Sequence, residues 1–375
     1  MHVRIALDGL PLTETLTGVG NYTLELARAL SILRPNIEFE VVAPRTYLSE
    51  IDLGNTRPNL KAVQVQTNAA TRHWWSIGLP SYIHKNSLAL FHGTNFEVPL
   101  RGPCPTVVTI HDLSLLRHST THKTRAVWRG RMRLPLMSRK ATMLITPSEA
   151  VRREVCSEFE LDPDRVVGIP LAPSPMFRRV ERGHAEKTLR RLGVEDQFLL
   201  FVGTIEPRKN VLTLLQAFER LIRSTDLRPQ LIIAGRVGWK AEQVLSYVNR
   251  PDLRDKVRVI GYVSKEELCS LYSACVSLIY PSIHEGFGLP PLEAMACGAP
   301  VIASSVPSIN QKVARVVPVT DIDSLTEAMV QLLTEPSTRA TLAELGMKHA
   351  ATFSWQRTAE LTFAVYEEAL SRAKG

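Results

Sequence analysis

A chain of 375 residues, 45% of them hydrophobic, is long enough to bury two cores, which predicts a soluble protein of two domains. No run of about 18 apolar residues is present, so a membrane-spanning helix is excluded. The net charge is +8, and five cysteines without C-x-x-C spacing indicate neither a zinc site nor a disulfide framework, but a reducing, cytoplasmic compartment.

Apolar runs alternate with amphipathic stretches through the first half of the chain. Strands are predicted over residues 3–7, 39–42, 89–91, 106–110 and 141–146. Helices are predicted over 21–33 and, behind a Ser148 cap, up to residue 159. This alternation predicts a parallel, doubly wound α/β sheet with binding residues beyond the carboxyl ends of its strands.

A proline-rich segment at 170–178 separates this half from a second set of the same kind. It predicts a domain boundary between residues 1–171 and 172–354. The second half repeats the scheme, with strands over 198–202, 230–234, 257–260, 276–280 and 301–303. A long amphipathic helix follows the cap residue Ser354.

The most informative segment is Glu285-Gly-Phe-Gly-Leu-Pro-Pro-Leu-Glu293, which lies between two of the predicted strands. A strand, a glycine loop and a helix present free backbone N–H groups to a phosphate at the helix N-terminus. Pro290 or Pro291 suits the first helical position. Because a carboxylate repels phosphate, Glu285 and Glu293 are expected to face sugar hydroxyls, which predicts a nucleotide-sugar site.

With the following Ala-Met-Ala-Cys-Gly-Ala-Pro-Val-Ile-Ala-Ser, this segment resembles the E-x7-E signature of the retaining glycosyltransferases of family 4. The resemblance implies the GT-B fold, two Rossmann-like domains facing a central cleft. It implies that the N-terminal domain binds the acceptor, that residues 172–354 bind the nucleotide sugar, and that the last helix, 355–375, crosses back onto the N-terminal domain. An ordinary strand–helix corner of an α/β protein is the alternative.

Gly203 ends a predicted strand, and Arg208-Lys209 stand just before a predicted helix over 211–223. Two cations at the carboxyl end of a strand can neutralise a diphosphate leaving group, where charge develops in the transition state. In the family that this chain resembles, such a pair clamps the diphosphate, and many members need no metal. Many relatives have an arginine where Thr204 stands, and Arg208 is the candidate to replace it. Basic residues on the surface at a helix start are the alternative.

The resemblance extends to the donor helix. It implies that the helix start at Gly286, Phe287, Gly288 and Leu289 binds the diphosphate together with the two cations. Glu285 would then bind hydroxyls of the donor sugar, and Glu293 those of the ribose.

Two further segments carry weaker predictions from the resemblance. Val263 is expected to contact the nucleobase through its backbone, beside a capping box of Ser264 and Glu267. Gly18 and Gly20 are expected in a loop that closes over the donor phosphate, with a plain turn as the alternative.

Histidines at strand ends form the last set of candidate site residues. His111 is expected to bind the donor sugar and to stabilise its oxocarbenium character, although a structural histidine is the alternative. His92 and Asn95 are weaker candidates for sugar or acceptor contacts.

Residues 117–140 are strongly basic and include no acidic residue. Tryptophan, leucine and methionine are interleaved with the cations, a pattern that suits an anionic membrane surface or a phosphate-bearing acceptor. Nucleic acid is the rival partner, but no nucleic-acid motif accompanies the segment. A solvated helix without a partner is the other alternative. We therefore expect a peripheral protein on the inner face of the membrane that does not bind nucleic acid.

The predicted reaction is transfer of a hexose from a nucleotide diphosphate sugar to a glycan or polyprenyl-linked acceptor. Residues 202–210 and 111–114 resemble bacterial mannosyltransferases of polysaccharide and O-antigen assembly, so GDP-mannose leads and UDP-hexoses follow. Ser308, Gln311 and Lys312 stand where relatives usually have an acidic residue and a glycine, which allows a changed donor preference in the 308–319 loop. A catalytically silent GT-B scaffold is the alternative from another class.

Overall fold

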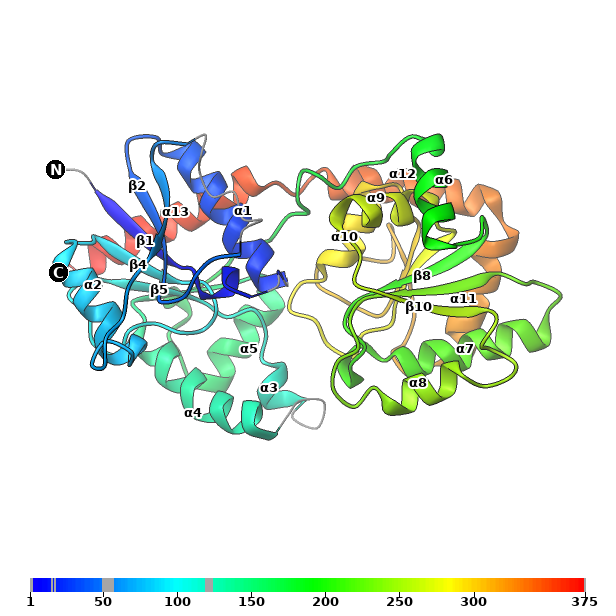
Figure 1. Ribbon diagram of the computed structural model, residues 1–375, viewed down its shortest axis with the longest axis horizontal. Coiled ribbons are helices and arrows are strands. Elements are labelled where there is room, and N and C mark those ends of the chain that lie inside the picture. Colours follow the sequence, from blue (N-terminus) through cyan, green and yellow to red (C-terminus); the bar gives the residue numbers. More distant parts are fainter. Residues whose placement is uncertain (1–2, 15, 17, 49–56, 119–123, 374–375) are drawn as a thin grey trace. The chain divides into compact units, whose positions relative to one another are not determined.

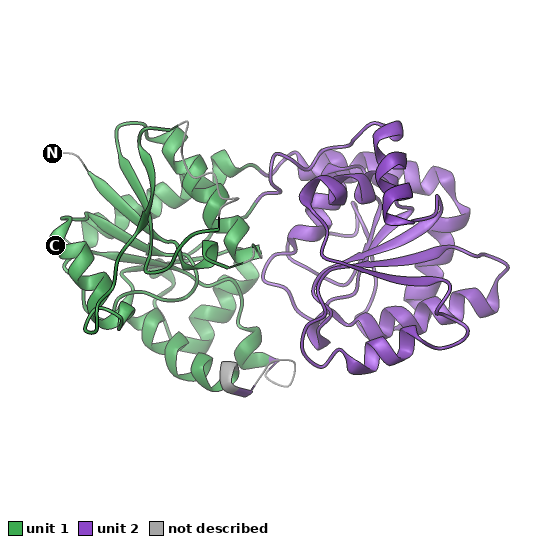
Figure 2. Ribbon diagram, viewed as in Figure 1, with its two compact units in different colours: residues 1–117, 125–171, 354–375 green, residues 118–124, 172–353 purple. Residues whose placement is uncertain are grey.

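The computed structural model describes residues 3–14, 16, 18–48, 57–118 and 124–373. The chain divides into two compact units (Figures 1 and 2). The N-terminal unit consists of residues 1–117, 125–171 and 354–375, and the C-terminal unit of residues 118–124 and 172–353. Each unit is a parallel sheet with helices packed on it (Figure 1).

The N-terminal unit has the strand order β3-β2-β1-β4-β5-β6-β7, with every neighbouring pair parallel. Its strands are β1 (Arg4–Asp8), β2 (Glu38–Ala43), β3 (Leu60–Gln64), β4 (Leu90–Gly93), β5 (Thr106–Thr109), β6 (Met143–Thr146) and β7 (Val166–Gly168). Its helices are α1 (Gly18–Leu33), α2 (Leu79–Lys85), α3 (Ser114–Arg117), α4 (Thr124–Lys140), α5 (Glu149–Phe159) and α13 (Trp355–Arg372). Short helical turns, η1 (Leu10–Leu12), η2 (Trp74–Gly78) and η4 (Pro163–Arg165), complete the unit.

The C-terminal unit has the strand order β10-β9-β8-β11-β12-β13, again parallel throughout. Its strands are β8 (Phe198–Val202), β9 (Gln230–Ala234), β10 (Val257–Gly261), β11 (Ser277–Tyr280), β12 (Val301–Ala303) and β13 (Arg315–Val316). Its helices are α6 (Arg182–Leu192), η5 (Pro207–Lys209), α7 (Val211–Ser224), α8 (Glu242–Val248), α9 (Lys265–Ala274), α10 (Leu289–Ala296), α11 (Ile322–Thr334) and α12 (Pro336–Ala350). Both units are therefore α/β sheets of the doubly wound kind that the sequence predicts.

The last helix, α13, packs within the N-terminal unit. The hydroxyl of Tyr366 lies 2.7 Å from Nδ1 of His92, and the guanidinium of Arg34 lies 4.4 Å from the centre of the Phe363 ring. At its start, Ser354 accepts a hydrogen bond from the backbone N–H of residue 357, which confirms the predicted cap.

Helix α1 begins earlier than the sequence predicts. Gly18 and Gly20 belong to its first turn, so the prediction of a glycine-rich loop between strand and helix was wrong. Gly20 is buried, and a Cβ atom there would come within 2.9 Å of the carbonyl oxygen of Pro11, so close packing favours glycine in this helix despite its low helix propensity. Thr17, the residue before this helix, lies outside the described residues.

Helix α4 carries most of the basic segment, but two of its arginines are engaged within the unit. Nη2 of Arg129 lies 2.7 Å, and Nη2 of Arg133 3.1 Å, from the buried carboxylate of Glu97. The basic surface is therefore smaller than the sequence indicates. Lys123 lies outside the described residues.

The strand order of each sheet fixes where a ligand can bind. In the N-terminal unit the direction of winding reverses between β1 and β4, and in the C-terminal unit between β8 and β11. In open α/β sheets, ligands bind beyond the carboxyl ends of the strands at such reversals. Candidate ligand-binding residues are therefore those that follow β1, β4, β8 and β11.

Candidate active site

The glycine turn after β11 leads directly into α10 as predicted. Gly288 is the N-cap residue with φ +99°, and a proline lies in the first two helical positions. A Cβ atom at Gly288 would come within 2.9 Å of both Ser308 Oγ and Val306 Cγ2. Only glycine fits here, because both the backbone angle and the close neighbours exclude a side chain. The turn thus places the N-terminus of α10, the positive end of its dipole, directly after β11.

The unusual loop after β12 holds this turn in place. Ser308 is buried, its hydroxyl donates to the carbonyl oxygen of Gly288 at 2.8 Å, and its backbone N–H donates to Phe287. A ring nitrogen of His349 lies 2.8 Å from the carbonyl oxygen of Ser308. Lys312, by contrast, is exposed. The serine therefore has a structural role that the sequence did not reveal.

Arg208 and Lys209, which follow β8, meet Glu285, which follows β11. Nζ of Lys209 lies 2.5 Å from Oε1 of Glu285 and donates to the hydroxyl of Tyr280 at 2.8 Å. Nη1 of Arg208 lies 3.0 Å from the same carboxylate oxygen, and its Nη2 lies 2.9 Å from Glu206. We call Arg208, Lys209 and Glu285 the cation cluster.

Burial makes the charges of the cation cluster interdependent. Lys209 is only 8% exposed, and the side chains of Arg208 and Glu285 are 15% and 10% exposed. Burial alone raises the pKa of Glu285, but the positive charges of Lys209 and Arg208 outweigh it and lower this pKa to about 2. Burial also lowers the pKa of Lys209 against the attraction of Glu285. Glu285 is thus ionised at neutral pH and holds both cations in place.

Glu293 lies on α10, and its environment differs from that of Glu285 in the cation cluster. Its carboxylate is partly buried, and the hydroxyl of Tyr272 on α9 lies 3.5 Å from Oε2. Burial raises the pKa of Glu293 to about 7. Val263 lies half-buried between β10 and α9, next to the capping box in which Ser264 and Glu267 exchange hydrogen bonds, as predicted.

Two glycines form a close backbone contact at the carboxyl ends of β8 and β9. Gly203 has φ +152°, and a Cβ atom at Gly235, whose φ is +145°, would come within 2.0 Å of the carbonyl oxygen of Gly203. Side chains are therefore excluded at these two positions. Gly235 was not predicted as a site residue, although its place directly after an apolar strand repeats the signal seen at Gly203.

The two histidines of the N-terminal unit have different environments. His92 is fully buried, with Nδ1 2.7 Å from Tyr366 and Nε2 2.8 Å from Thr109. The interpretation of His92 as a sugar contact was therefore wrong, because the tertiary structure occupies both ring nitrogens. His111 is only partly buried, and its Nε2 lies 2.8 Å from the carbonyl oxygen of Thr94.

The contact to a carbonyl oxygen fixes the tautomer of His111. Nε2 carries the proton that it donates to Thr94, so Nδ1 of the neutral ring is an acceptor. Burial lowers the pKa of His111, which favours this neutral form. The ring packs edge-on against Tyr22 with centroids 4.9 Å apart. His111 belongs to the N-terminal unit, whereas the cation cluster belongs to the C-terminal unit.

Sequence comparisons match both units. Residues 186–349 match the family model described as "Glycosyl transferases group 1", and residues 16–172 that described as "Glycosyltransferase Family 4". The chain is 31% identical over 374 residues to the O-antigen chain mannosyltransferase B of Escherichia coli, which covers 95% of this chain and 97% of that protein. It is 26% identical to the serotype-specific mannosyltransferase WbdA of Escherichia coli over 90% of this chain, but spans only 42% of that longer protein.

Solved structures show the same fold. The sucrose-phosphate synthase of Thermosynechococcus elongatus aligns with a TM-score of 0.79 at 22% identity, over 99% of this chain and 100% of that one. Anabaena HepE in complex with UDP and glucose aligns with a TM-score of 0.76 at 16% identity, over 98% of this chain and 100% of that one. At this level of identity the likeness concerns the fold alone. Among the described residues, no helix combines the length and apolar character needed to cross a membrane.

Proposed function

The chain belongs to the group 1 glycosyltransferases of family 4 and has the GT-B fold, and from this membership we propose that it transfers mannose from GDP-mannose to a glycan or polyprenyl-linked acceptor. The observation that carries the proposal is the cation cluster at the β8/β11 reversal, in the same unit as the N-terminus of α10. Mannose as the sugar is supported by the relatives named mannosyltransferases, one of which matches nearly the whole chain.

The proposed leaving group is GDP, whose diphosphate gains negative charge as the sugar–phosphate bond breaks. Lys209 and Arg208 are held in fixed positions by Glu285, so they stabilise this charge without reorganising during the reaction. The N-terminus of α10 adds the positive end of its dipole. In this proposal the cations take the place of a metal ion, so transfer should persist in EDTA.

We further propose that the reaction retains the anomeric configuration by attack on the leaving-group side. A double-displacement route would need a free carboxylate nucleophile beside the anomeric carbon. Glu285 is engaged by two cations, and Glu293 belongs to α10, where the ribose is expected. The acceptor oxygen therefore bonds to C1 as the bond to the phosphate oxygen breaks, and that phosphate oxygen takes the acceptor proton.

Two alternatives make distinct predictions. A UDP-hexose donor is represented among the structural neighbours by HepE, whose structures hold UDP and UDP-glucose. A silent scaffold would keep the buried cation cluster with no reaction to serve, although burying charges costs free energy.

A thermal-shift screen with GDP, UDP, ADP and their sugar conjugates separates these alternatives, because selective binding raises the melting temperature. A shift with GDP and GDP-mannose is expected. A shift with uridine nucleotides alone would replace the donor, and no shift with any nucleotide would favour the scaffold. The anomeric configuration of the product, read by NMR, then tests retention.

We also propose that α4 docks on an anionic membrane. Trp128, Met132 and Leu136 are 67%, 58% and 43% exposed and recur every four residues, so they form one apolar stripe. Arg131 and Arg139 are exposed on the same helix. An apolar stripe flanked by arginines matches the chemistry of an interface that inserts shallowly among anionic headgroups.

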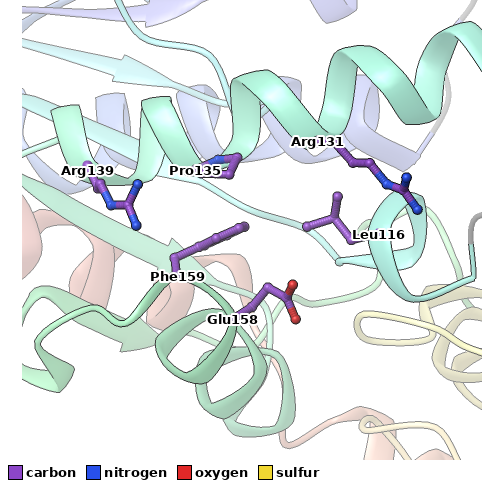
Figure 3. A pocket seen from close by; sticks show the side chains of 6 residues that line it. All are labelled: Leu116, Arg131, Pro135, Arg139, Glu158 and Phe159. Atoms are coloured by element: carbon purple, nitrogen blue, oxygen red, sulfur yellow. The ribbon is translucent and has the colours of Figure 1, made fainter.

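A cavity of about 430 Å³ lies beside α4 and strengthens this proposal (Figure 3). Figure 3 shows the arginine side chains of α4 on one side and residues of α5 on the other. Its lining residues are Leu116, Arg131, Pro135, Arg139, Glu158 and Phe159. The two guanidinium groups offer a headgroup phosphate the bidentate donors that arginine supplies.

Vesicle sedimentation tests the membrane proposal. The wild-type protein should pellet with phosphatidylglycerol vesicles but not with phosphatidylcholine vesicles, and less so at high salt. The double variant Trp128→Ser, Met132→Ser should stay in the supernatant. Ile32→Ser is the matched control, because Ile32 is an apolar residue 64% exposed elsewhere in the same unit. Equal pelleting of the double variant would contradict the proposal.

A further inference from the structure

Tyr280, the last residue of β11, brings a neutral hydroxyl group to the cation cluster. Its side chain is fully buried, and Nζ of Lys209 donates to its hydroxyl at 2.8 Å. The same Nζ lies 5.0 Å from the centre of the Tyr280 ring. Because β11 pairs with β8 on one side and with β12 on the other, the phenol is carried by a central strand of the sheet. A packed side chain on such a rigid element has a well-defined position.

Two acceptors fix the direction of the remaining N–H bond of Lys209. An ammonium group has three donors and no acceptor. Glu285 takes one donor, with Nζ 2.5 Å from its Oε1, and the Tyr280 hydroxyl takes a second. Among the residues that the structure describes, Nζ makes no third hydrogen bond. One acceptor alone would leave the ammonium free to rotate about the N···O axis, so Tyr280 fixes where the third donor points.

The Tyr280 hydroxyl keeps its own proton in this position. Burial, the negative charge of Glu285 and a hydrogen bond to this carboxylate raise the pKa of Tyr280 well above its usual range. A neutral phenol accepts from Lys209 with its oxygen and donates its proton to Glu285. Tyr280, Lys209 and Glu285 therefore hold one another through hydrogen bonds.

Lys209 depends on its partners to keep its charge. Burial lowers the pKa of Lys209, and the charge of Glu285 opposes this effect. Arg208 lowers the same pKa, and Glu206 raises it. With Tyr280, these are the charged and titratable groups that act on Nζ within the described part of the chain. Because a hydrogen bond from a charged donor is stronger than one from a neutral donor, the Tyr280 hydroxyl stabilises the protonated form of Lys209.

We propose that Tyr280 is a positioning residue of the transfer reaction, whose hydroxyl keeps the Lys209 ammonium protonated and directs its third N–H bond at the leaving diphosphate. The proposal rests on the proposed function, because it needs a leaving group for Lys209 to stabilise. It goes beyond that function by giving a neutral residue outside the E-x7-E segment a part in the reaction. Stabilisation of developing charge depends on donors whose direction is fixed before the reaction starts.

The variant Tyr280→Phe isolates the hydroxyl group, because phenylalanine keeps the aromatic ring beside Lys209. Its kcat with GDP-mannose should fall about tenfold, as for a misdirected group, while the donor KM stays within about threefold. The alkaline limb of the pH profile of kcat should move down by about one pH unit, because a lysine without this acceptor loses its proton at lower pH. A wild-type pH profile in the variant would overturn the proposal.

A double-variant cycle separates positioning from a structural role. In the Lys209→Met background, Tyr280→Phe should have almost no further effect on kcat, because the charge that Tyr280 positions is gone. Additive losses in kcat would contradict the proposal. Tyr366→Phe is the matched control, because it also deletes a buried hydroxyl, which lies on α13 at 2.7 Å from Nδ1 of His92. This control should leave kcat and its pH profile unchanged.

Thermal melts keep this inference distinguishable from the proposed function, because they require no turnover. Tyr280→Phe leaves the buried ammonium short of an acceptor at neutral pH, and this cost ends once Lys209 is neutral. The folded-state pKa of Lys209 lies below its unfolded value of 10.5, so the variant should regain stability as the pH rises. Its melting temperature relative to wild type should be lowest near pH 7 and recover towards pH 10.

The two tyrosine variants give opposite results in these melts. The difference between Tyr366→Phe and wild type should be the same at pH 7 and pH 10, because no lysine loses an acceptor there. Recovery of Tyr280→Phe supports the role of its hydroxyl even if wild type transfers no sugar, a result that would count against the proposed function alone. A difference for Tyr280→Phe that does not change with pH would overturn the inference even if transfer is observed.

Discussion

Removing the charge of Lys209 is the most demanding test of the proposed mechanism. The variant Lys209→Met keeps an unbranched chain of similar length, so it removes the charge while filling the buried site. In wild type, Nζ lies 2.5 Å from Glu285 and 2.8 Å from the Tyr280 hydroxyl. The loss of one preorganised charge donor lowers turnover by about 10²-fold to 10³-fold. We therefore expect kcat to fall by at least about 100-fold.

The same variant should lose stability by an amount that the structure constrains. Removing one partner of a buried ion pair costs about 3–5 kcal/mol, because the other charge stays buried. Arg208 still lies 3.0 Å from Glu285, so the lower end, about 3 kcal/mol, is expected. For a unit of this size, such a loss lowers the melting temperature by roughly 10 °C. Activity must therefore be compared at 20 °C or below, where the variant is folded.

The pH dependence provides a separate check on the same charges. The pKa of Glu285 is lowered from 4.5 to about 2, so its ionisation stabilises the fold above pH 4.5, and this stabilisation is lost as the pH falls towards 2. The difference corresponds to about 3 kcal/mol. In Lys209→Met the loss of stability below pH 4.5 should be smaller, because the carboxylate has lost its closest cation.

The assay combines turnover of GDP-mannose with thermal melts at several pH values. Lys348→Met is the matched control, because this lysine is exposed on α12 and pairs with the exposed Glu344 at the surface. Its turnover and melting temperature should change little. Folded Lys209→Met with turnover within a few-fold of wild type would refute the assignment of Lys209 to the leaving group.

Three further predictions concern single side chains. Glu293→Gln should raise the donor KM. Because the pKa of the Glu293 carboxyl group is about 7, the wild-type donor KM should fall as the pH rises from 6 to 8. An unchanged donor KM in the variant would show that Glu293 does not bind the ribose. Asp8→Asn should stabilise the protein more at pH 8 than at pH 5. An aspartate whose pKa is raised from 3.8 to about 7 destabilises the fold progressively as it ionises, and the variant removes this effect. An equal shift of the melting temperature at both pH values would contradict this. Ser308→Ala should lower the free energy of unfolding by about 1 kcal/mol and raise the donor KM, because it loosens the turn at Gly288. Ser305→Ala, at an exposed position, should do neither. Equal melting curves and donor KM values for the two variants would show that the hydrogen bond is dispensable.

The sequence was most informative where the signal is local. The strand over 198–202 was predicted to the residue, because five successive apolar side chains are all that a central parallel strand needs. The caps at Ser148, Ser264 and Ser354 were also predicted, since each depends on a side chain and a backbone N–H a few residues away. The strand β3 was missed because its sequence, LKAVQ, is neither continuously apolar nor strictly alternating, and only one of its side chains is buried.

The sequence by itself determined the α/β class, the glycine turn before α10 and the family, since these depend on periodicity, on backbone angles available to glycine and on a contiguous signature. Only the tertiary structure decided which distant side chains meet. Lys209 and Glu285 are 76 residues apart and come together because β8 pairs with β11. Asp8 and Glu97 share a cavity because β1 pairs with β4. The pairing of strands sets these neighbours through the burial of whole sheets, and no single segment encodes it.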